Sequence, residues 1–129
     1  MREPVRTRQQ QWAQRAYDAV SARKQARVGD DYGSFCKGFP ALIHQSGLCQ
    51  ALAFAQAKAG GHDGRSEAGQ YLEDLASVLG LQRNELVDSS RSADVLTYQR
   101  LTQDALAAAT WLKRYAEALL DDVKGNSNQ

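Results

Sequence analysis

Apolar residues along this chain recur three or four positions apart, and no segment shows the alternating pattern of a β-strand. The longest such run extends from about Ser92 to Lys124, where Leu101, Ala105, Ala108 and Leu112 share one face of a helix. A stripe this wide is typical of the central helix of a bundle. The sequence therefore predicts an all-α fold, a compact bundle of about five helices with a long C-terminal helix.

Four further helices are predicted upstream of this run. The first is expected from about Pro4 to Val28, the third from Gly47 to Ala59, and the fourth from Ser66, a plausible N-cap, to Gly80. The second opens near Tyr32, and Gly38-Phe39-Pro40 is expected to kink or break it. Proline has no N–H for an interior helical bond and disfavours helical geometry in the residue before it.

The 129 residues are interpreted as one domain. No internal repeat or low-complexity linker divides the chain, and Leu81–Val87 is expected to add only a short turn between the fourth and fifth helices. We therefore predict a single helical domain over residues 1–124 and a flexible polar tail over residues 125–129.

Positive charge gathers at the beginning of the chain, although the formal net charge is only +1. Residues 1–28 carry seven arginines and lysines against two acids, whereas the stretch from Glu85 to Asp122 leans acidic. This asymmetry favours one face for a polyanion and another for a protein partner. The alternative is a basic helix that is simply solvated.

The first helix carries a candidate RNA-contact pattern. Arg8, Trp12 and Arg15 lie along one side of a helix, where the ring can pack against bases or sugars while the arginines meet phosphates. The residues alone favour the alternative, in which Trp12 belongs to the core and the arginine stems cover it. Trp111 lies on a mostly polar side of the last helix, where another helix or a partner would cover it. Both tryptophans are candidate protein-interface residues.

Catalytic and metal chemistry find little support. Cys36 and His44 are separated by the predicted break, so no nucleophile–base geometry follows, and Cys49 lies on an apolar helix side where buried thiols are usually inert. Two cysteines and two histidines match no recurrent zinc spacing. The sequence therefore predicts no enzyme activity, no cofactor and no metal site.

No hydrophobic signal segment and no membrane-length apolar run appears in the sequence. The chain is therefore expected to be cytoplasmic, with both thiols reduced.

Two segments together resemble one known family. They are YGSFCKGFPALIHQSGLCQALAFAQAKAG, from Tyr32 to Gly60, and YQRLTQDALAAATWLKRYAEALL near the C-terminus. The most specific pieces are Pro40–Ile43 leading into Ser46–Leu52, and Trp111–Arg114. On these residues the chain is similar to the small α-helical subunit of the type III-B (Cmr-type) CRISPR RNA-guided effector complex.

The resemblance implies a non-catalytic role in antiviral defence. Small subunits of this family stack head to tail beside a filament of RAMP-fold backbone subunits that holds the guide RNA, and they help to line the groove for target RNA. The implied partners are the backbone and large subunits, guide and target RNA through the assembled complex, and further copies of the chain. The implied RNA-facing residues are Arg8, Arg15, Arg23, Lys24, Arg27 and Lys37, with Lys113 and Arg114 as an alternative patch.

Three other interpretations remain open. A freestanding helical nucleic-acid-binding module would need a tight turn before a recognition helix, and the glycine-rich loop after Gly60 weakens it. A protein–protein adaptor without RNA contact would tolerate charge reversal on the first helix. A small enzyme would depend on Cys36 or His44.

Overall fold

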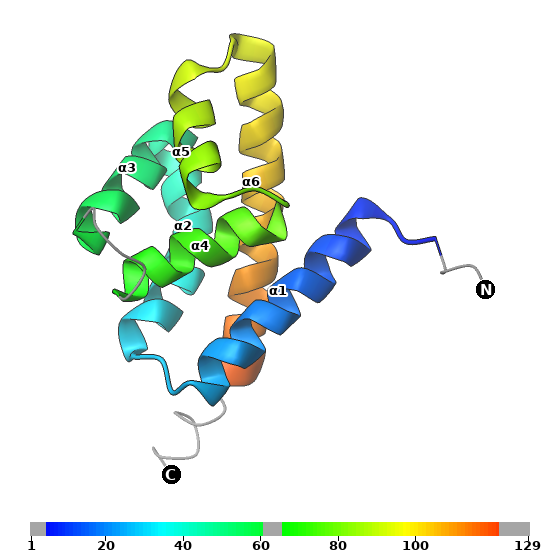
Figure 1. Cartoon of the computed structure of the whole chain (residues 1–129), viewed down its shortest axis with the longest axis vertical. Helices are drawn as coiled ribbons and strands as arrows, with labels where there is room; N and C mark the ends of the chain where they lie inside the picture. The colour runs from blue at the N-terminus through cyan, green and yellow to red at the C-terminus, as the bar shows by residue number, and fades with distance from the viewer. Residues whose placement is uncertain (1–4, 61–65, 122–129) are drawn as a thin grey trace.

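The helices of this computed structural model gather around a long C-terminal helix and enclose one cluster of buried apolar side chains (Figure 1). The structure describes residues 5–60 and 66–121. All regular secondary structure in this part is helical, which confirms the predicted all-α class. The elements are α1 (Arg8–Gln25), α2 (Asp30–Ser46), α3 (Leu48–Ala59), α4 (Glu67–Val78), α5 (Arg83–Ser92), α6 (Val95–Tyr115) and a π-helical turn, η1 (Ala116–Leu120).

α1 begins at Arg8, four residues later than predicted. Thr7 and Gln10 form a reciprocal cap, in which the Gln10 N–H donates to Thr7 Oγ1 (3.0 Å) and the Thr7 N–H donates to Gln10 Oε1 (2.9 Å). This cap satisfies two backbone donors at the helix start. Val5, which was expected on the buried face, precedes the helix and is fully exposed.

The break expected at Gly38–Pro40 is wrong, because α2 runs from Asp30 to Ser46 with Pro40 inside it. Proline removes the N–H that would bond to the carbonyl of Cys36. Cys36, Phe39, Pro40 and Ile43 are all buried, so tertiary packing holds the helix across the missing bond.

The turn between α2 and α3 depends on Gly47. Its φ of 83° and ψ of 160° lie in a region essentially restricted to glycine. The N–H of Cys49, in the first turn of α3, donates to the Tyr98 hydroxyl of α6 (3.1 Å). At the start of α4, the predicted N-cap is confirmed, since Ser66 Oγ accepts from the Gly69 N–H (3.1 Å).

A full helix, α5, stands where a short extra turn was expected. Its pattern was weak because only Leu86, Val87 and Ser90 are buried. α6 begins at Val95 rather than Ser92, and the preceding Asp94 accepts from the Thr97 N–H (2.9 Å).

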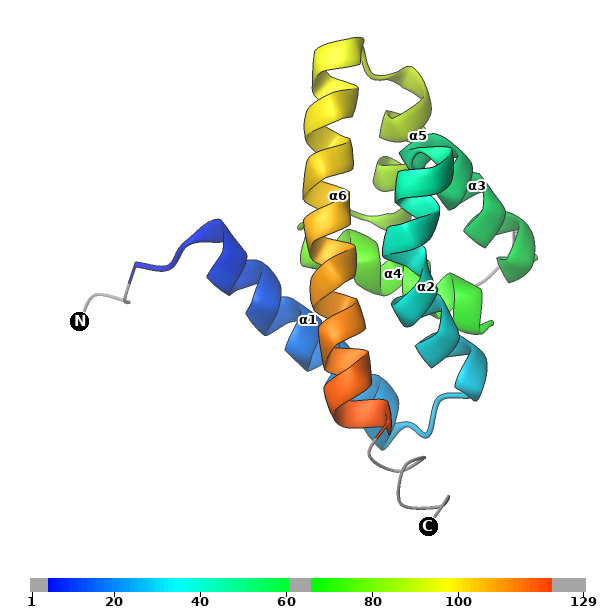
Figure 2. The ribbon, with the colours of Figure 1, turned by 180° about the vertical axis from the view of Figure 1, so that it is seen from behind.

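α6 packs against α1 on one side and α2 on the other (Figures 1 and 2). Ala105, Ala108 and Ala109 are fully buried, and these small side chains let the neighbouring helices come close to α6. None of the helices in the described part is long and apolar enough to cross a membrane. The predicted tail over residues 125–129 lies outside the described residues.

Candidate nucleic-acid interface

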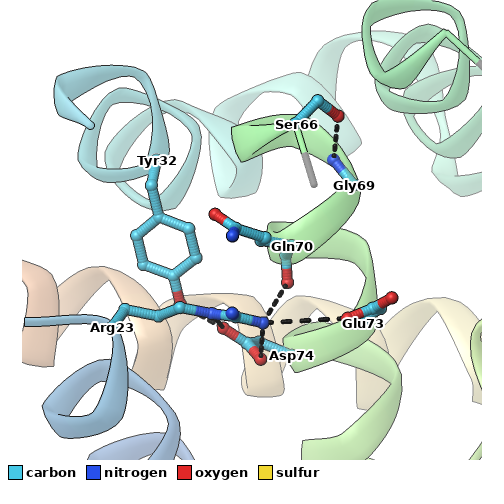
Figure 3. Close-up of polar contacts among 7 residues, drawn as sticks. All are labelled: Arg23, Tyr32, Ser66, Gly69, Gln70, Glu73 and Asp74. Atoms are coloured by element: carbon cyan, nitrogen blue, oxygen red, sulfur yellow. Dashed lines mark hydrogen bonds and ion pairs between the residues drawn. The ribbon is translucent and has the colours of Figure 1, made fainter. Parts of the chain in front are cut away.

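Arg23, which was expected to face RNA, instead joins three helices of the structure (Figure 3). Its Nε and Nη2 donate to the two carboxylate oxygens of Asp74 on α4, at 2.9 and 3.0 Å. The Tyr32 hydroxyl of α2 donates to Asp74 Oδ2 at 2.5 Å, and Glu73 lies 3.8 Å from Arg23 Nη2. Only 23 % of the Arg23 side chain is exposed. The guanidinium therefore neutralises a buried carboxylate.

This network perturbs the titration of its members. Burial, the charges near it and the Asp74 carboxylate raise the pKa of Tyr32, which stays neutral and donates its proton. Burial lowers the pKa of Arg23, but the hydrogen bond and charge of Asp74 outweigh that effect and raise the pKa overall. The network therefore keeps Arg23 charged and fixed.

Arg8 and Arg15 also make contacts within the chain. Arg8 Nη2 bonds to Asp104 Oδ1 of α6 (2.6 Å), and its guanidinium lies 4.8 Å from the Trp12 ring centroid. Arg15 Nη1 donates to the Val78 carbonyl at the end of α4 (3.0 Å). Both side chains hold α1 on the bundle, while Arg8 remains 68 % exposed.

Three other predicted RNA-facing residues come together at a cavity of about 710 Å³. Lys24 and Arg27 line it from the C-terminal end of α1, and Lys37 lines it from α2. The two helices meet at this point because a short connection turns the chain back after α1 (Figure 1). The fold therefore builds a cationic site from residues of two helices.

Arg27 has an unusual backbone conformation, with a φ of 57°. Its N–H donates to the Lys24 carbonyl (3.0 Å), and the Val28 N–H donates to the Arg23 carbonyl (3.0 Å), which is the hydrogen-bond pattern of a Schellman ending. Glycine normally occupies this left-handed position, and an arginine there carries a conformational cost. The chain thus presents a guanidinium at the cavity where glycine would fold more easily.

Two acids also line the cavity, Asp30 and Asp121. Lys37 Nζ pairs with Asp121 Oδ1 at 2.5 Å, and both side chains are about 40 % exposed, at 38 % and 42 %. Sequence analysis missed Asp121, because it lies 84 positions from Lys37 and carries no local signal. Lys24 and Arg27 are the exposed cations of the site.

The tryptophans differ in environment. Trp12 is buried, with 6 % exposed, and belongs to the core cluster. Trp111 packs partly against that cluster, and its Nε1 donates to Gln9 Oε1 of α1 (2.7 Å). In the alternative basic patch, Arg114 is 64 % exposed and lies 3.6 Å from Glu117, and Lys113 is half-buried.

The residues once considered for catalysis do not converge. Cys36 is buried and His44 is exposed eight positions further along α2, about 12 Å along the helix axis at ~1.5 Å per residue. Burial raises the pKa of the Cys36 thiol to about 12, which disfavours the nucleophilic thiolate. In residues 5–60 and 66–121, no group of three or more candidate ligands is placed to hold a metal ion.

Fold and site together define a small all-α protein whose candidate site is a cationic cavity between two helix ends. A family profile described as "CRISPR-associated protein (Cas_Cmr5)" matches residues 8–119. The chain belongs to this family, which confirms the resemblance drawn from the sequence.

Two relatives from Thermus thermophilus support this assignment. The chain is 40 % identical over 119 residues to "CRISPR system Cmr subunit Cmr5", a match that covers 92 % of this chain and 100 % of the relative. The X-ray crystal structure of a CRISPR-associated Cmr5 family protein is similar, with a TM-score of 0.76 and 41 % identity. That structural match covers 89 % of this chain and 98 % of the other.

Proposed function

We propose that this chain is the small, non-catalytic subunit of a type III-B CRISPR ribonucleoprotein effector. In this role several copies stack beside the guide-RNA-bearing RAMP backbone and help to bind target RNA in cytoplasmic antiviral defence. Membership of the Cmr5 family supports the assignment to such a complex.

The observation that carries the RNA contact is the gathering of Lys24, Arg27 and Lys37 at one cavity. Guide–target pairing supplies sequence specificity in such complexes, so the protein needs only contacts to the phosphate backbone. The exposed Lys24 and Arg27 meet phosphates directly, and Lys37 joins them by exchanging Asp121 for a phosphate oxygen. Lys113 and Arg114 form the second proposed patch.

The other cations of α1 are proposed to have a smaller share in RNA binding. Arg23 is held by the buried Asp74, and Arg15 by the Val78 carbonyl. Charge reversal at Arg23 would place two carboxylates against each other inside the protein and disturb its folding. A test of RNA binding must therefore spare Arg23.

The test is target-RNA binding by the effector complex reconstituted with a Lys24→Glu/Arg27→Glu chain. We expect weaker binding and a log K–log[salt] slope shallower by at least about 1.4, from two phosphates at ~0.7 each. Lys58→Glu, an exposed residue of α3, is the matched control and should change little.

Unchanged RNA binding by an assembled complex would contradict the phosphate contact and favour the adaptor interpretation. Failure of the wild-type chain to assemble with RAMP-type subunits would contradict the subunit assignment itself.

A further inference from the structure

Three aromatic rings form a row across the junction of α1 and α6. Trp111 and Tyr115 of α6 are nearly parallel, with ring centroids 6.0 Å apart and an interplanar angle of 19°. Tyr17 of α1 meets Tyr115 edge to face at 5.5 Å and 82°. The two helices converge toward their C-terminal ends, which brings these rings together (Figures 1 and 2).

Folding accounts for only part of this row. Tyr115 and Trp111 pack against the core cluster, whereas Tyr17 is 44 % exposed and belongs to the few large side chains left open to solvent. The bond from Trp111 Nε1 to Gln9 fixes the indole in place. The row is thus a fixed aromatic surface with one open end at Tyr17.

The open end lies in line with the cationic cavity. Tyr17 and Lys24 are seven positions apart on α1, so they lie on the same side of the helix, about 10 Å apart along its axis. Lys24 and Arg27 then continue into the cavity. One strand can therefore place phosphates at the cavity and a neighbouring base at Tyr17.

The charges around the row are compatible with an anionic strand. Asp104 is paired with Arg8, Glu117 lies 3.6 Å from Arg114, and Asp18 accepts a hydrogen bond from Gln14. Each of these acids has a partner within the protein, and Arg8 and Arg114 keep most of their side-chain surface exposed, at 68 % and 64 %.

We propose that Tyr17, Tyr115 and Trp111 form a stacking platform for an unpaired base of the RNA strand whose phosphates occupy the Lys24–Arg27–Lys37 cavity. This inference rests on the proposed function and extends it from phosphate contact to contact with the bases of single-stranded RNA. Aromatic side chains bind single strands without sequence preference because every base offers a π face.

The experiment compares binding of two single-stranded RNA oligonucleotides to the full chain at low salt. One is oligo-uridine, and the other is an abasic strand of equal length, which has the same phosphates and no bases. Tyr17→Leu should weaken oligo-uridine binding at least about fivefold and leave abasic binding unchanged. Tyr17→Phe, which retains the ring, should bind both strands as the wild type does.

Other results separate the platform from the cavity. If Lys24→Glu/Arg27→Glu weakens both strands while Tyr17→Leu affects neither, the platform is refuted and phosphate binding stands. Equal weakening of both strands by Tyr17→Leu also refutes stacking, as does preserved RNA binding with impaired complex assembly, which would make the row a protein-docking surface. Absence of binding to either strand by the wild type overturns both.

Discussion

Individual cations that look alike in the sequence have different roles in the structure. Arg23 and Lys24 are neighbours, yet Arg23 turns inward to Asp74 and Lys24 lines the cationic cavity. A helix sends consecutive side chains in different directions, about 100° apart at ~3.6 residues per turn. Charge counts alone therefore overestimate the number of residues available to RNA.

Tyr32 and Tyr71 give a prediction at the same scale, because both are fully buried and differ in their hydroxyl groups. The Tyr32 hydroxyl donates to Asp74, whereas the Tyr71 hydroxyl has no hydrogen-bond partner within the described residues. Tyr32→Phe should lower the free energy of unfolding by about 1.5–3 kcal/mol, since it removes a bond to a charged acceptor. Tyr71→Phe should leave it unchanged or raise it by up to about 1 kcal/mol.

Urea denaturation of the two variants against the wild type measures this difference. Equal losses in both variants would contradict the assignment of the Tyr32–Asp74 bond.

At the scale of elements, packing overrules local signals in α2. The helix passes through Pro40 because the buried face of Phe39 and Ile43 is held by its neighbours. The connection after it needs glycine, since the chain ends one helix and begins the next at the single residue Gly47.

The glycines of α2 and its end should respond in opposite ways to alanine. Gly38 is exposed, has no positive φ, and a Cβ added there would meet nothing within 4 Å, so Gly38→Ala should stabilise the protein by about 0.5–1 kcal/mol. Gly47→Ala should destabilise it by about 1–3 kcal/mol, because its φ is +83°. Thermal unfolding by circular dichroism reports both; a loss of stability in Gly38→Ala would refute the strain-free helical site.

For the whole molecule, three buried acidic groups couple folding to alkaline pH. Burial raises the pKa of the Cys36 thiol from its ordinary value of 9.0 to about 12, and burial also raises the pKa values of Tyr32 and Tyr71. The folded state therefore favours the neutral forms. Their contribution to stability is complete below the unfolded-state pKa values and is lost as the pH rises toward the folded ones.

Between pH 9 and 10, Cys36 should dominate this dependence, since tyrosines in the unfolded chain have a pKa of about 10. We expect the free energy of unfolding to fall with pH in this window. Cys36→Ala should make the fall shallower by about 1 kcal/mol per pH unit, whatever its cost in overall stability. Urea titrations at several pH values measure the slope, and an unchanged slope would contradict the assignment.

The sequence by itself determined the all-α class, most helix positions, the ends of α3 and α4, and the family. These follow from local periodicity, from caps such as Ser66 and from residue motifs such as Trp111–Arg114, none of which needs a distant partner. It also placed Lys24, Arg27 and Lys37 among the candidate RNA residues.

Only the tertiary structure decided which of the candidate residues share a site. The contacts of Arg23 with Asp74, Lys37 with Asp121 and Tyr17 with Tyr115 join residues far apart in the chain. The same packing carried α2 through Pro40 and made a helix of the weakly patterned α5. Helical periodicity fixes the direction of a side chain on its own helix, but the arrangement of helices fixes what that side chain meets.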